Sequence, residues 1–509
     1  MPHTTIQSGS MTAASFYLGL GAVCLFAATL FFWDLNGTDL WSSHEARAGQ
    51  NAQRMIEDGT WGSLQLFDGQ YDFQKPPAFY WMVASIARAK GGQVDRWSVR
   101  LPAACSAVAL VLILALYLKN QGHPLAALAS SFTLATSIHF TSAARTGRID
   151  MPLTLATSVA VLALLPRSHA CTADHGTGRR IWVSVIAALA LAWGMLLKGP
   201  IALLLPVAVI ISMRLIYLVL RVPTYPGSAR LILILVSAMA LAAPWYVWID
   251  RHSGGEFTRV FFWHHNIERA TGSSATLAVH PWWYYIPRFF IDFLPATPFL
   301  MFMLFSWVMD AGFRRQEFAH VGLVWLAIML GLLSFAKFKR SDYLLPAYPG
   351  AALGIGTFVE YHAGRLSLAS RRKLFLLAVS IALSCLAGWY WFHSTIEKKM
   401  EARAAQSDFA LVIRQHAPAP VPVTLFRVEA HLLTFHLGRP VHTLVEWSDL
   451  RNLLAQSGVH WFITSPDLVA ECCEQIPSRR ITVIACSADF TKRNPHRPLV
   501  LCCAFDNHE

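Results

Sequence analysis

The chain has 509 residues, of which 55% are hydrophobic and only 14% are charged, and its mean hydropathy is +0.42. These proportions exclude an ordinary soluble enzyme and predict a chain that lies mostly in a membrane. The formal net charge is +12, but Lys and Arg are spread over short loops between apolar runs, so we expect membrane lipid and a phosphate-bearing substrate as partners and no nucleic acid.

Long apolar runs recur from residue 13 to residue 392. A hydrocarbon core about 30 Å thick requires about 20 apolar residues per helix, so the pattern predicts a mainly α, polytopic bundle of about 11 to 13 spans. Residues 1–12 contain no Lys or Arg, and the first run lacks a small-residue cleavage site, so we expect a short N-terminal tail and a retained first span. The predicted spans are 13–33, 98–118, 124–143, 149–165, 181–197, 200–220, 231–249, 283–309, 320–336, 344–362 and 373–392.

Successive crossings alternate sides, which assigns every loop to one of two faces. The stretch 76–89 is short for a span, and we expect it to be interfacial, re-entrant or one of a crossing pair. Face B loops are basic with few acids, so we expect them in the cytoplasm, and face A outside it. Face A, where carboxylates, His, Lys and aromatic residues gather, comprises 34–97, 144–148, 198–199, 250–282, 337–343 and the tail.

The tail, residues 393–509, changes character and predicts a small soluble α/β domain without chemistry. Short strands are predicted at 421–426, 459–465, 481–486 and 498–505, and helices near 431–435 and 448–456. Five of the nine cysteines lie in this tail without the CxxC spacing of a zinc or redox site, and sequence alone leaves a disulfide open. The membrane domain is accordingly 13–392, with large loops at 34–97 and 250–282.

The first large face A loop begins with a predicted amphipathic helix that ends at Gly59. Ser42 and Glu45 form a capping-box pattern that can satisfy free backbone N–H groups. Alternatively, Glu45, His44 and Arg47 lie together at a helix N-terminus, where the dipole favours an anionic ligand. Both interpretations stay open.

Three further face A segments hold charged residues at the ends of apolar runs. Lys75 precedes two prolines that fix its direction and lies near Tyr80; it either contacts a phosphate or snorkels to the interface. Asp150 follows Arg148 and is either a helix cap or a functional carboxylate at a span mouth. Lys198 lies in a break between two runs and is either a snorkelling terminus or a phosphate ligand.

Two later segments complete the candidate site. His264, His265 and Asn266 could bind a metal ion or line a sugar pocket, although adjacent histidines rarely hold one ion together. Lys339 and Arg340 precede Tyr343 beside an apolar run, and with Lys337 they suggest a clamp for a phosphate diester.

In this order, the motifs HEAR, QKPPAFYW, GRIDMP, LLKGP, WHHN and KRSDYLLPAYP resemble the GT-C membrane glycosyltransferases, of the protein O-mannosyltransferase and aminoarabinose lipid A transferase type. The resemblance covers roughly residues 13–360. It implies a multi-span bundle of a bacterial inner membrane, an extracytoplasmic active site and C-terminal domain, a polyprenyl-phosphate sugar donor, and inversion by single displacement with no obligatory metal. The sequence departs from the usual first-loop acidic pair at His44, and from the usual Glu before Lys-Pro-Pro at Gln74.

Sugar transfer from a phosphate carrier needs cations for the leaving group and a carboxylate for the acceptor's proton. We expect Arg47, Lys75, Lys198, Lys339 and Arg340 to bind the donor phosphate, and Glu45, Asp150 or His44 to be catalytic. Arg148, Tyr80, Tyr343 and the 264–266 segment are expected to line the pocket. The acceptor is a lipid A-type glycolipid, a glycan or a protein hydroxyl. The alternatives are a secondary transporter or flippase, which would show mid-span charges and a repeated half-structure, and a non-catalytic scaffold.

Overall fold

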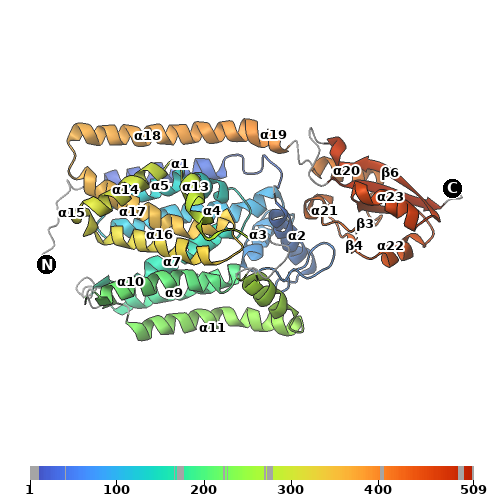
Figure 1. Ribbon diagram of the computed structural model, residues 1–509, viewed down its shortest axis with the longest axis horizontal. Helices are drawn as coiled ribbons and strands as arrows, with labels where there is room; N and C mark the ends of the chain where they lie inside the picture. The colour runs from blue at the N-terminus through green and yellow to red at the C-terminus, as the bar shows by residue number, and fades with distance from the viewer. Residues whose placement is uncertain are drawn as a thin grey trace. The chain divides into compact units, whose positions relative to one another are not determined.

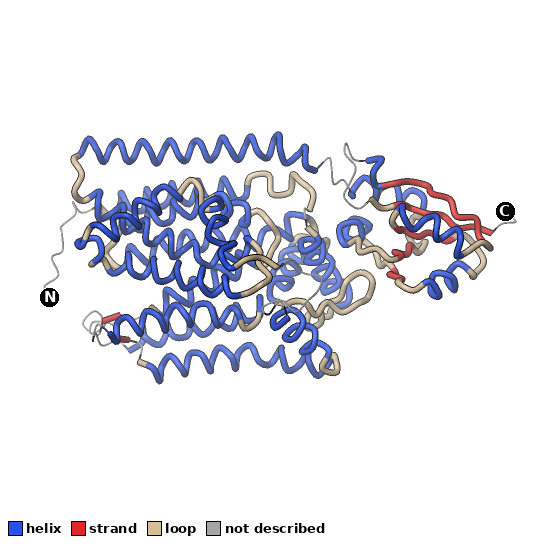
Figure 2. Tube along the Cα trace, in the orientation of Figure 1, coloured by secondary structure: helices blue, strands red, loops and turns tan. Residues whose placement is uncertain are grey.

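The computed structural model describes residues 11–40, 42–165, 167–168, 177–219, 221, 224–225, 227–268, 271, 279–401, 406–490 and 498–506 (Figures 1 and 2). The chain divides into two compact units. Unit 1 comprises Met1–Trp33, Phe73–Phe79 and Arg100–Ala387, and unit 2 comprises Asp34–Asp72, Tyr80–Val99 and Gly388–Glu509. Each unit is described by itself.

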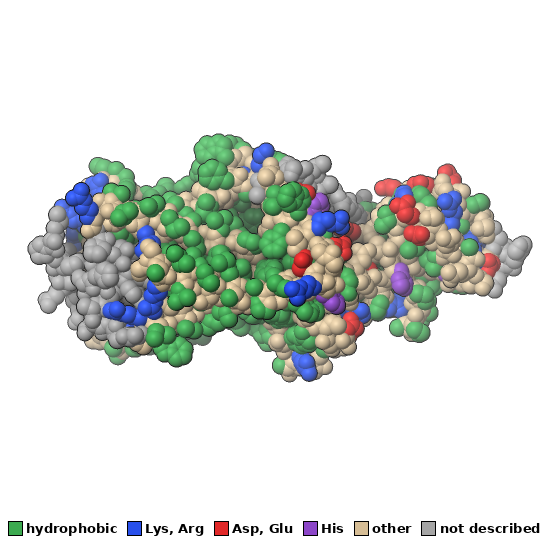
Figure 3. Space-filling model, turned by 90° about the horizontal axis from the view of Figure 1, so that it is seen from below, with side chains coloured by type: hydrophobic (Ala, Val, Ile, Leu, Met, Phe, Trp, Pro, Cys, Tyr) green, Lys and Arg blue, Asp and Glu red, His purple; other side chains and the backbone are tan. Residues whose placement is uncertain are grey.

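The predicted apolar runs form helices in the structure. Among the described residues, seven helices are long and apolar enough to cross a membrane. Hydrophobic side chains cover the middle of the helical bundle in Figure 3, and Lys and Arg gather at its left end. The chain is therefore an integral membrane protein with a mainly α fold. The seven helices are α1 (Ala13–Phe32), α4 (Arg96–Asn120), α9 (Thr177–Lys198), α10 (Ile201–Val219), α11 (Ser228–His252), α16 (Glu317–Phe335) and α18 (Leu368–Trp391).

The remaining predicted spans are shorter or broken helices. The run 283–309 is bent by 114° in a break that contains Pro295, which cannot continue a helix. Breaks of this kind bring polar side chains to helix ends within unit 1. The elements are α5 (Pro124–Thr136), α6 (Ile138–Ala144), α7 (Asp150–Leu164), η1 (Thr258–Glu268), η2 (Trp282–Tyr284), α13 (Tyr285–Asp292), α14 (Thr297–Met309), α15 (Ala311–Arg314), η3 (Ser341–Ala347), α17 (Tyr348–Ala363) and a short hairpin of β1 (Arg167–Ser168) and β2 (Thr224–Tyr225).

Glycines let α16 and α17 approach closely and so fix η3 between them. A Cβ on Gly322 would lie 2.7 Å from the carbonyl oxygen of Gly350 and 2.7 Å from the nitrogen of Gly354. The buried indole of Trp325 in α16 also donates a 2.8 Å hydrogen bond to the carbonyl of Pro346, which lies in η3. Small residues at such crossings are typical of helices packed in membranes. The consequence is a fixed position for η3, which carries two residues of the site described below.

We expect Gly322→Ala to lower the thermal unfolding midpoint of the detergent-solubilised protein, because the new methyl group meets backbone atoms that cannot rotate away. Overpacking of this kind costs roughly 1–3 kcal/mol. Gly331→Ala is the matched control on the same helix, since nothing lies within 4 Å of its added Cβ. It should leave the midpoint unchanged or raise it slightly. Equal midpoints for the two variants would contradict the close approach.

Unit 2 contains a mixed five-stranded sheet of order β4-β3-β5-β7-β6. Strand β3 pairs in parallel with β4 and β5, and β7 pairs antiparallel with β5 and β6. All four predicted tail strands and both predicted tail helices are present, whereas β4, α20 and α23 were not predicted. The bounds are β3 (Val423–Phe426), β4 (His442–Leu444), β5 (His460–Thr464), β6 (Arg479–Cys486), β7 (Val500–Asp506), η4 (Phe392–Glu397), α19 (Lys398–Glu401), α20 (Gln406–His416), α21 (His431–Leu437), α22 (Trp447–Leu454), α23 (Pro466–Gln475) and η5 (Ser487–Phe490).

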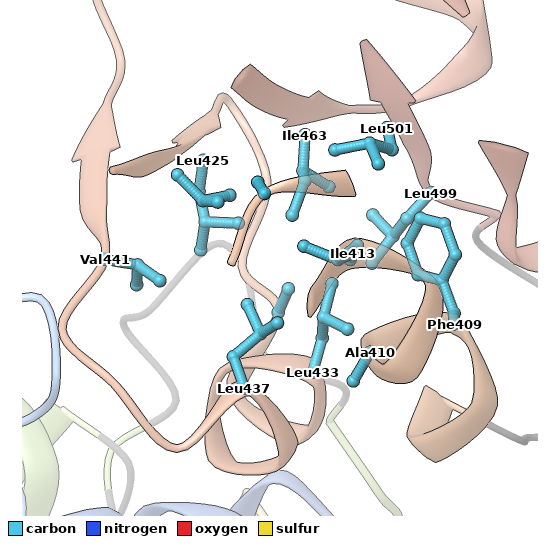
Figure 4. Packing of buried hydrophobic residues seen from close by; sticks show 13 residues of the cluster. Phe409, Ala410, Ile413, Leu425, Leu433, Leu437, Val441, Ile463, Leu499 and Leu501 are labelled. Carbon is cyan, nitrogen blue, oxygen red and sulfur yellow. The ribbon is translucent and has the colours of Figure 1, made fainter. Parts of the chain in front are cut away.

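The tail sheet has an apolar core on each of its faces. Leu425 and Ile463 from adjacent parallel strands point toward Phe409 and Ile413 of α20 and Leu433 of α21 (Figure 4). The alternation of strand side chains sends their neighbours into a second cluster on the other face. Two thiols of that second cluster, Cys472 and Cys502, are buried, and burial raises the pKa of each to about 12. Every cysteine in the described part is free, and Cys171 lies outside it.

The first large loop contributes α2 (Ser43–Asp58) and α3 (Ala78–Ala89) from Tyr80 onward to unit 2. Helix α2 packs against α21 so tightly that a Cβ on Gly49 would lie 2.4 Å from the ring of Phe435. The buried Gln50 amide donates to the carbonyl of His431 at 2.9 Å and accepts the amide hydrogen of Phe67 at 3.2 Å. The loop helix and the tail therefore share one packed unit.

Candidate active site

Asp150 and Lys198 form an ion pair at one end of unit 1. Asp150 is the first residue of α7 and Lys198 the last of α9, so each charge lies where the helix dipole favours it. The lysine Nζ is 2.5 Å from Asp150 Oδ1, and the two side chains are only 15% and 14% exposed. The ammonium also lies 4.0 Å from the centroid of the Tyr343 ring, which is cation–π distance. Three predicted site residues, from three separate motifs, meet here.

Gly199 ends α9 directly after Lys198 and fixes the turn. Its φ is +78°, which glycine adopts without strain, and an added Cβ would lie 2.5 Å from the Phe261 ring. Phe261 belongs to a buried apolar cluster with Phe73. Lys75, two residues after Phe73, has its Nζ 3.0 Å from the carbonyl oxygen of Gln74. One aromatic cluster therefore anchors both the Lys198 turn and the segment that carries Lys75.

We expect Gly199→Ala to lower the thermal midpoint, because the methyl group meets a buried ring as well as adding backbone strain. Gly122→Ala is the control, since Gly122 has φ +88° but nothing within 4 Å of an added Cβ. The difference between the two midpoints isolates the clash with Phe261. If the midpoints are equal, the aromatic cluster does not hold the turn.

A second carboxylate, Asp342 at the start of η3, is surrounded by cations. It precedes Tyr343, whose ring contacts Lys198. It is in contact with the Arg148 guanidinium, and Arg340 Nη2 is 3.6 Å away. Burial alone would raise the pKa of the Asp342 carboxyl. The hydrogen bond from His139 and the positive charges of Arg148 and Arg340 outweigh burial and hold this pKa well below its usual value. Asp342 is therefore ionised at neutral pH and orients the arginines around it.

His139 links Asp342 to a further carboxylate. Its Nε2 is 3.3 Å from Asp342 Oδ1, while its Nδ1 is 3.1 Å from the hydroxyl of Tyr348 and 3.7 Å from Asp292 Oδ2. Asp292 is in turn held by Arg288, whose Nε donates at 2.6 Å. These contacts form one polar network across α6, η3, α13 and α17. It gives the end of unit 1 a fixed arrangement of cations.

The two neighbouring cations Lys339 and Arg340 have different surroundings. Lys339 is 3% exposed, and its ammonium donates to the carbonyls of Ala336 and His280, the second at 3.2 Å. Burial lowers the pKa of Lys339. Arg340 joins the Asp342 cluster, and its backbone N–H donates to the hydroxyl of Tyr285 at 3.2 Å. The structure thus places Arg340, and not the Lys339 ammonium, beside the carboxylate cluster.

In unit 2, Glu45 lies in the first turn of α2. Its backbone N–H donates to Ser42 Oγ at 3.3 Å, so the predicted N-cap is formed, and the helix ends at Gly59 with φ +68° as predicted. The Glu45 side chain is fully buried. His44 lies on the same turn and is exposed. Capping and a chemical role for Glu45 remain compatible, because Ser42 supplies the cap oxygen.

Arg47 is held by Asp72, a residue without a role in the sequence analysis. The guanidinium lies 2.5 Å from Asp72 Oδ1, and Asn51 donates to Asp72 Oδ2 at 2.9 Å. Tyr80 is buried near this pair, and burial followed by the charge of Asp72 raises its pKa. A phosphate that binds Arg47 would therefore have to compete with Asp72.

The segment around His264 forms η1, a π-helix of unit 1. His264 Nδ1 lies 2.6 Å from Glu268 Oε2 on an exposed turn, and the Asn266 amide donates to the carbonyl of Phe261 at 2.7 Å. His265 is half-buried beside them. Within the described ranges, no group of three or more His, Cys, Asp and Glu side chains could hold one metal ion.

Sequence reasoning missed His139, Asp292, Asp342 and Tyr348. Asp342 lies inside a quoted motif but was given no role. His139 and Asp292 lie inside predicted spans, 124–143 and 283–309, and a titratable residue in an apolar run is itself a signal of function. That signal could have found both.

The chain is similar in sequence to known membrane glycosyltransferases. Residues 74–248 match the family model described as dolichyl-phosphate-mannose-protein mannosyltransferase. The chain is 31% identical over 354 residues to an undecaprenyl phosphate-alpha-4-amino-4-deoxy-L-arabinose arabinosyl transferase of Pseudomonas fluorescens, and the match covers 69% of this chain and 60% of that relative. A relative of the same name from Pseudomonas aeruginosa is 28% identical, with 72% and 64% covered.

Solved structures of membrane enzymes have a similar fold. The crystal structure of ArnT from Cupriavidus metallidurans bound to undecaprenyl phosphate matches 96% of this chain and 98% of its own, with a TM-score of 0.77 at 18% identity. The oligosaccharyltransferase of Archaeoglobus fulgidus matches 90% and 70%, with a TM-score of 0.54 at 14% identity. The predicted resemblance is confirmed: the chain has the fold of the GT-C membrane glycosyltransferases and is related in sequence to the aminoarabinose transferases, although it matches only 60–64% of the length of the two Pseudomonas relatives.

Proposed function

We propose that the chain is a glycosyltransferase that moves a sugar from a polyprenyl-phosphate carrier to an envelope acceptor at the outer face of the membrane. The observation that carries the proposal is the pair of carboxylate–cation clusters, Asp150 with Lys198 and Asp342 with its arginines, at one end of a membrane helix bundle. Charged side chains are costly in such a bundle unless they are paired or used. The sequence relatives and the shared fold support the same class of reaction.

The chemistry assigns separate tasks to these charges. An acceptor oxygen attacks the anomeric carbon, the bond from that carbon to the phosphate oxygen breaks, and the electron pair leaves with the polyprenyl phosphate. Negative charge therefore grows on the leaving group, and Lys198, Arg340 and Lys75 are the cations of unit 1 that we assign to it. A single displacement inverts the configuration of the sugar.

A carboxylate must accept the proton of the acceptor. Asp150 is our first candidate in unit 1, and Glu45 is the candidate of the first loop. In the structure Asp150 is paired with Lys198 at 2.5 Å. A donor phosphate that attracts Lys198 would weaken that pair and free the carboxylate to act as base. Donor binding and base activation would then be coupled through one lysine.

The test is incubation of the purified full chain with polyprenyl-phosphate sugars. Undecaprenyl phosphate-linked aminoarabinose is the first donor to try because the relatives carry that name. We expect consumption of one donor, release of polyprenyl phosphate and a mass increase of the acceptor. The acceptors to test are lipid A, a glycan and a protein. We also propose that EDTA leaves this rate unchanged, because the cations named above supply the positive charge. Absence of turnover with every donor would refute the proposal.

The site and the tail are proposed to lie outside the cytoplasm. This follows from the basic loops on face B, such as the one that holds Arg371 and Arg372. Cysteines introduced at Ser341 and at Arg372 should react with a membrane-impermeant thiol reagent from opposite sides in a variant that lacks the native cysteines. Labelling of both from one side would contradict the assigned orientation.

A further inference from the structure

A groove of about 660 Å³ lies within unit 1 between α18 and helices α1, α5 and α17. Its walls are apolar, and Phe26, Leu128, Phe132 and Phe375 are among them. This volume is within the range of ligand sites, roughly 300–1,000 Å³. Helix α18 runs along the edge of the bundle in Figure 1, and none of the residues in its most apolar 18-residue window is buried. The apolar side chains of α18 must therefore be covered by lipid or by another protein surface.

The groove runs along part of α18. Near the far end, Cys385 Sγ is 3.9 Å from the carbonyl oxygen of Thr136, so α18 touches α5 there. At the other end the lining residue is Arg371, whose Nη2 donates to the carbonyl of Gly364 at 3.3 Å. Along α18 the lining extends from Arg371 to Ala382, which is about 16 Å at 1.5 Å per residue. That length equals one leaflet, about half of a 30 Å hydrocarbon core.

The charges at the Arg371 end of the groove favour an anion. Arg371, Arg372 and Lys373 follow one another, and among the described residues no carboxylate forms an ion pair with any of them. The acidic lining residue, Glu360, is already satisfied by His123 at 2.7 Å and by the backbone N–H of Leu125 at 3.2 Å. Basic pockets between membrane helices are suited to anionic lipid headgroups.

We propose that an anionic glycerophospholipid of the leaflet on the Arg371 side binds in this groove, with an acyl chain between α18 and α5 and its phosphate on Arg371. Arg371 donates to Gly364, four residues after Glu360, and Glu360 accepts the N–H of Leu125 at the start of α5. His139 of the site, in contrast, follows the end of α5. A 13-residue helix is about 20 Å long, so this phosphate would be distinct from the donor phosphate. The lipid would add a second attachment of α18 to the bundle, beside the contact of Cys385 with Thr136.

The test compares two lipids and several variants without using transfer activity. The full chain, purified in mild detergent, is titrated with phosphatidylglycerol or phosphatidylethanolamine, and bound lipid is counted by native mass spectrometry. We expect one phosphatidylglycerol per chain, bound roughly tenfold more tightly than phosphatidylethanolamine. Arg371→Glu and the milder Arg371→Gln should remove most of this preference. Arg372→Glu is the matched control, since Arg372 does not line the groove and should keep affinity within about threefold.

A second variant tests the acyl chain instead of the phosphate. Ala378→Phe places a ring in the groove wall and should weaken both lipids equally, by roughly tenfold. Equal affinity for the two lipids, equal effects of Arg371→Glu and Arg372→Glu, or a tightly held polyprenyl phosphate in place of phospholipid would each overturn the assignment. Each outcome is independent of whether the chain transfers a sugar.

Discussion

Asp150→Asn is expected to reduce the rate of sugar transfer about a thousandfold, within the 10²–10⁴-fold range for loss of a general base. The amide cannot accept the acceptor's proton, and it also leaves Lys198 without its counter-charge at 2.5 Å. Initial rates with a saturating polyprenyl-phosphate sugar measure the effect. Lys198→Gln should instead raise KM and lower kcat together. Lys198 is assigned to the donor phosphate in the ground state, and its interaction strengthens in the transition state as negative charge grows on the leaving group.

The double variant Asp150→Asn/Lys198→Gln distinguishes a role of Asp150 in the ion pair from a role as general base. If the two residues act only as an ion pair, removal of both should recover most of the transfer rate that Asp150→Asn loses. If Asp150 is the base, the double variant stays as slow as Asp150→Asn. Asp310→Asn is the control, because Asp310 accepts hydrogen bonds at the start of α15 and asparagine caps a helix equally well. Near-normal transfer by Asp150→Asn would leave Glu45 as the remaining carboxylate candidate.

Local sequence signals predicted local structure well in this chain. The N-cap at Ser42 and the C-cap at Gly59 predicted the two ends of α2 to within a residue. Both caps depend only on the backbone next to them. The parity of apolar runs also placed Asp150 and Lys198 on the same face, and they are in contact. Periodicity and helix-end chemistry were sufficient for these features.

Pairings across long separations could not be predicted in this way. His139 and Asp342 are 203 residues apart, and nothing local to either residue specifies the other. The directions of adjacent side chains were also not predictable. Lys339 and Arg340 follow each other in an extended segment, where successive side chains point in opposite directions. The sequence showed three cations in one motif, but only the backbone geometry determines which of them reaches the carboxylates.

Asp342→Asn is expected to destabilise unit 1 as well as reduce transfer. The Asp342 side chain is 17% exposed and is paired with Arg148 and Arg340. Removal of the carboxylate from this partly buried cluster leaves the arginines without compensation, at a cost of roughly 1–3 kcal/mol. The thermal unfolding midpoint in detergent at pH 7 measures the loss. Asp58→Asn is the control, since its i,i+4 pair with Arg54 is on the surface and contributes no more than about 0.5 kcal/mol.

The pH dependence of the unfolding midpoint tests whether the charge of Asp342 accounts for the loss of stability. The pKa of Asp342 is lower in the folded chain than its usual value, so the folded state binds fewer protons there than the unfolded state does. Its contribution is therefore complete above about pH 5 and is lost as the pH falls through about 4 and below. The difference in midpoint between the native chain and Asp342→Asn should be constant from pH 5 to 8 and should narrow below pH 4. A constant difference down to pH 3 would show that shape, and not charge, accounts for the loss.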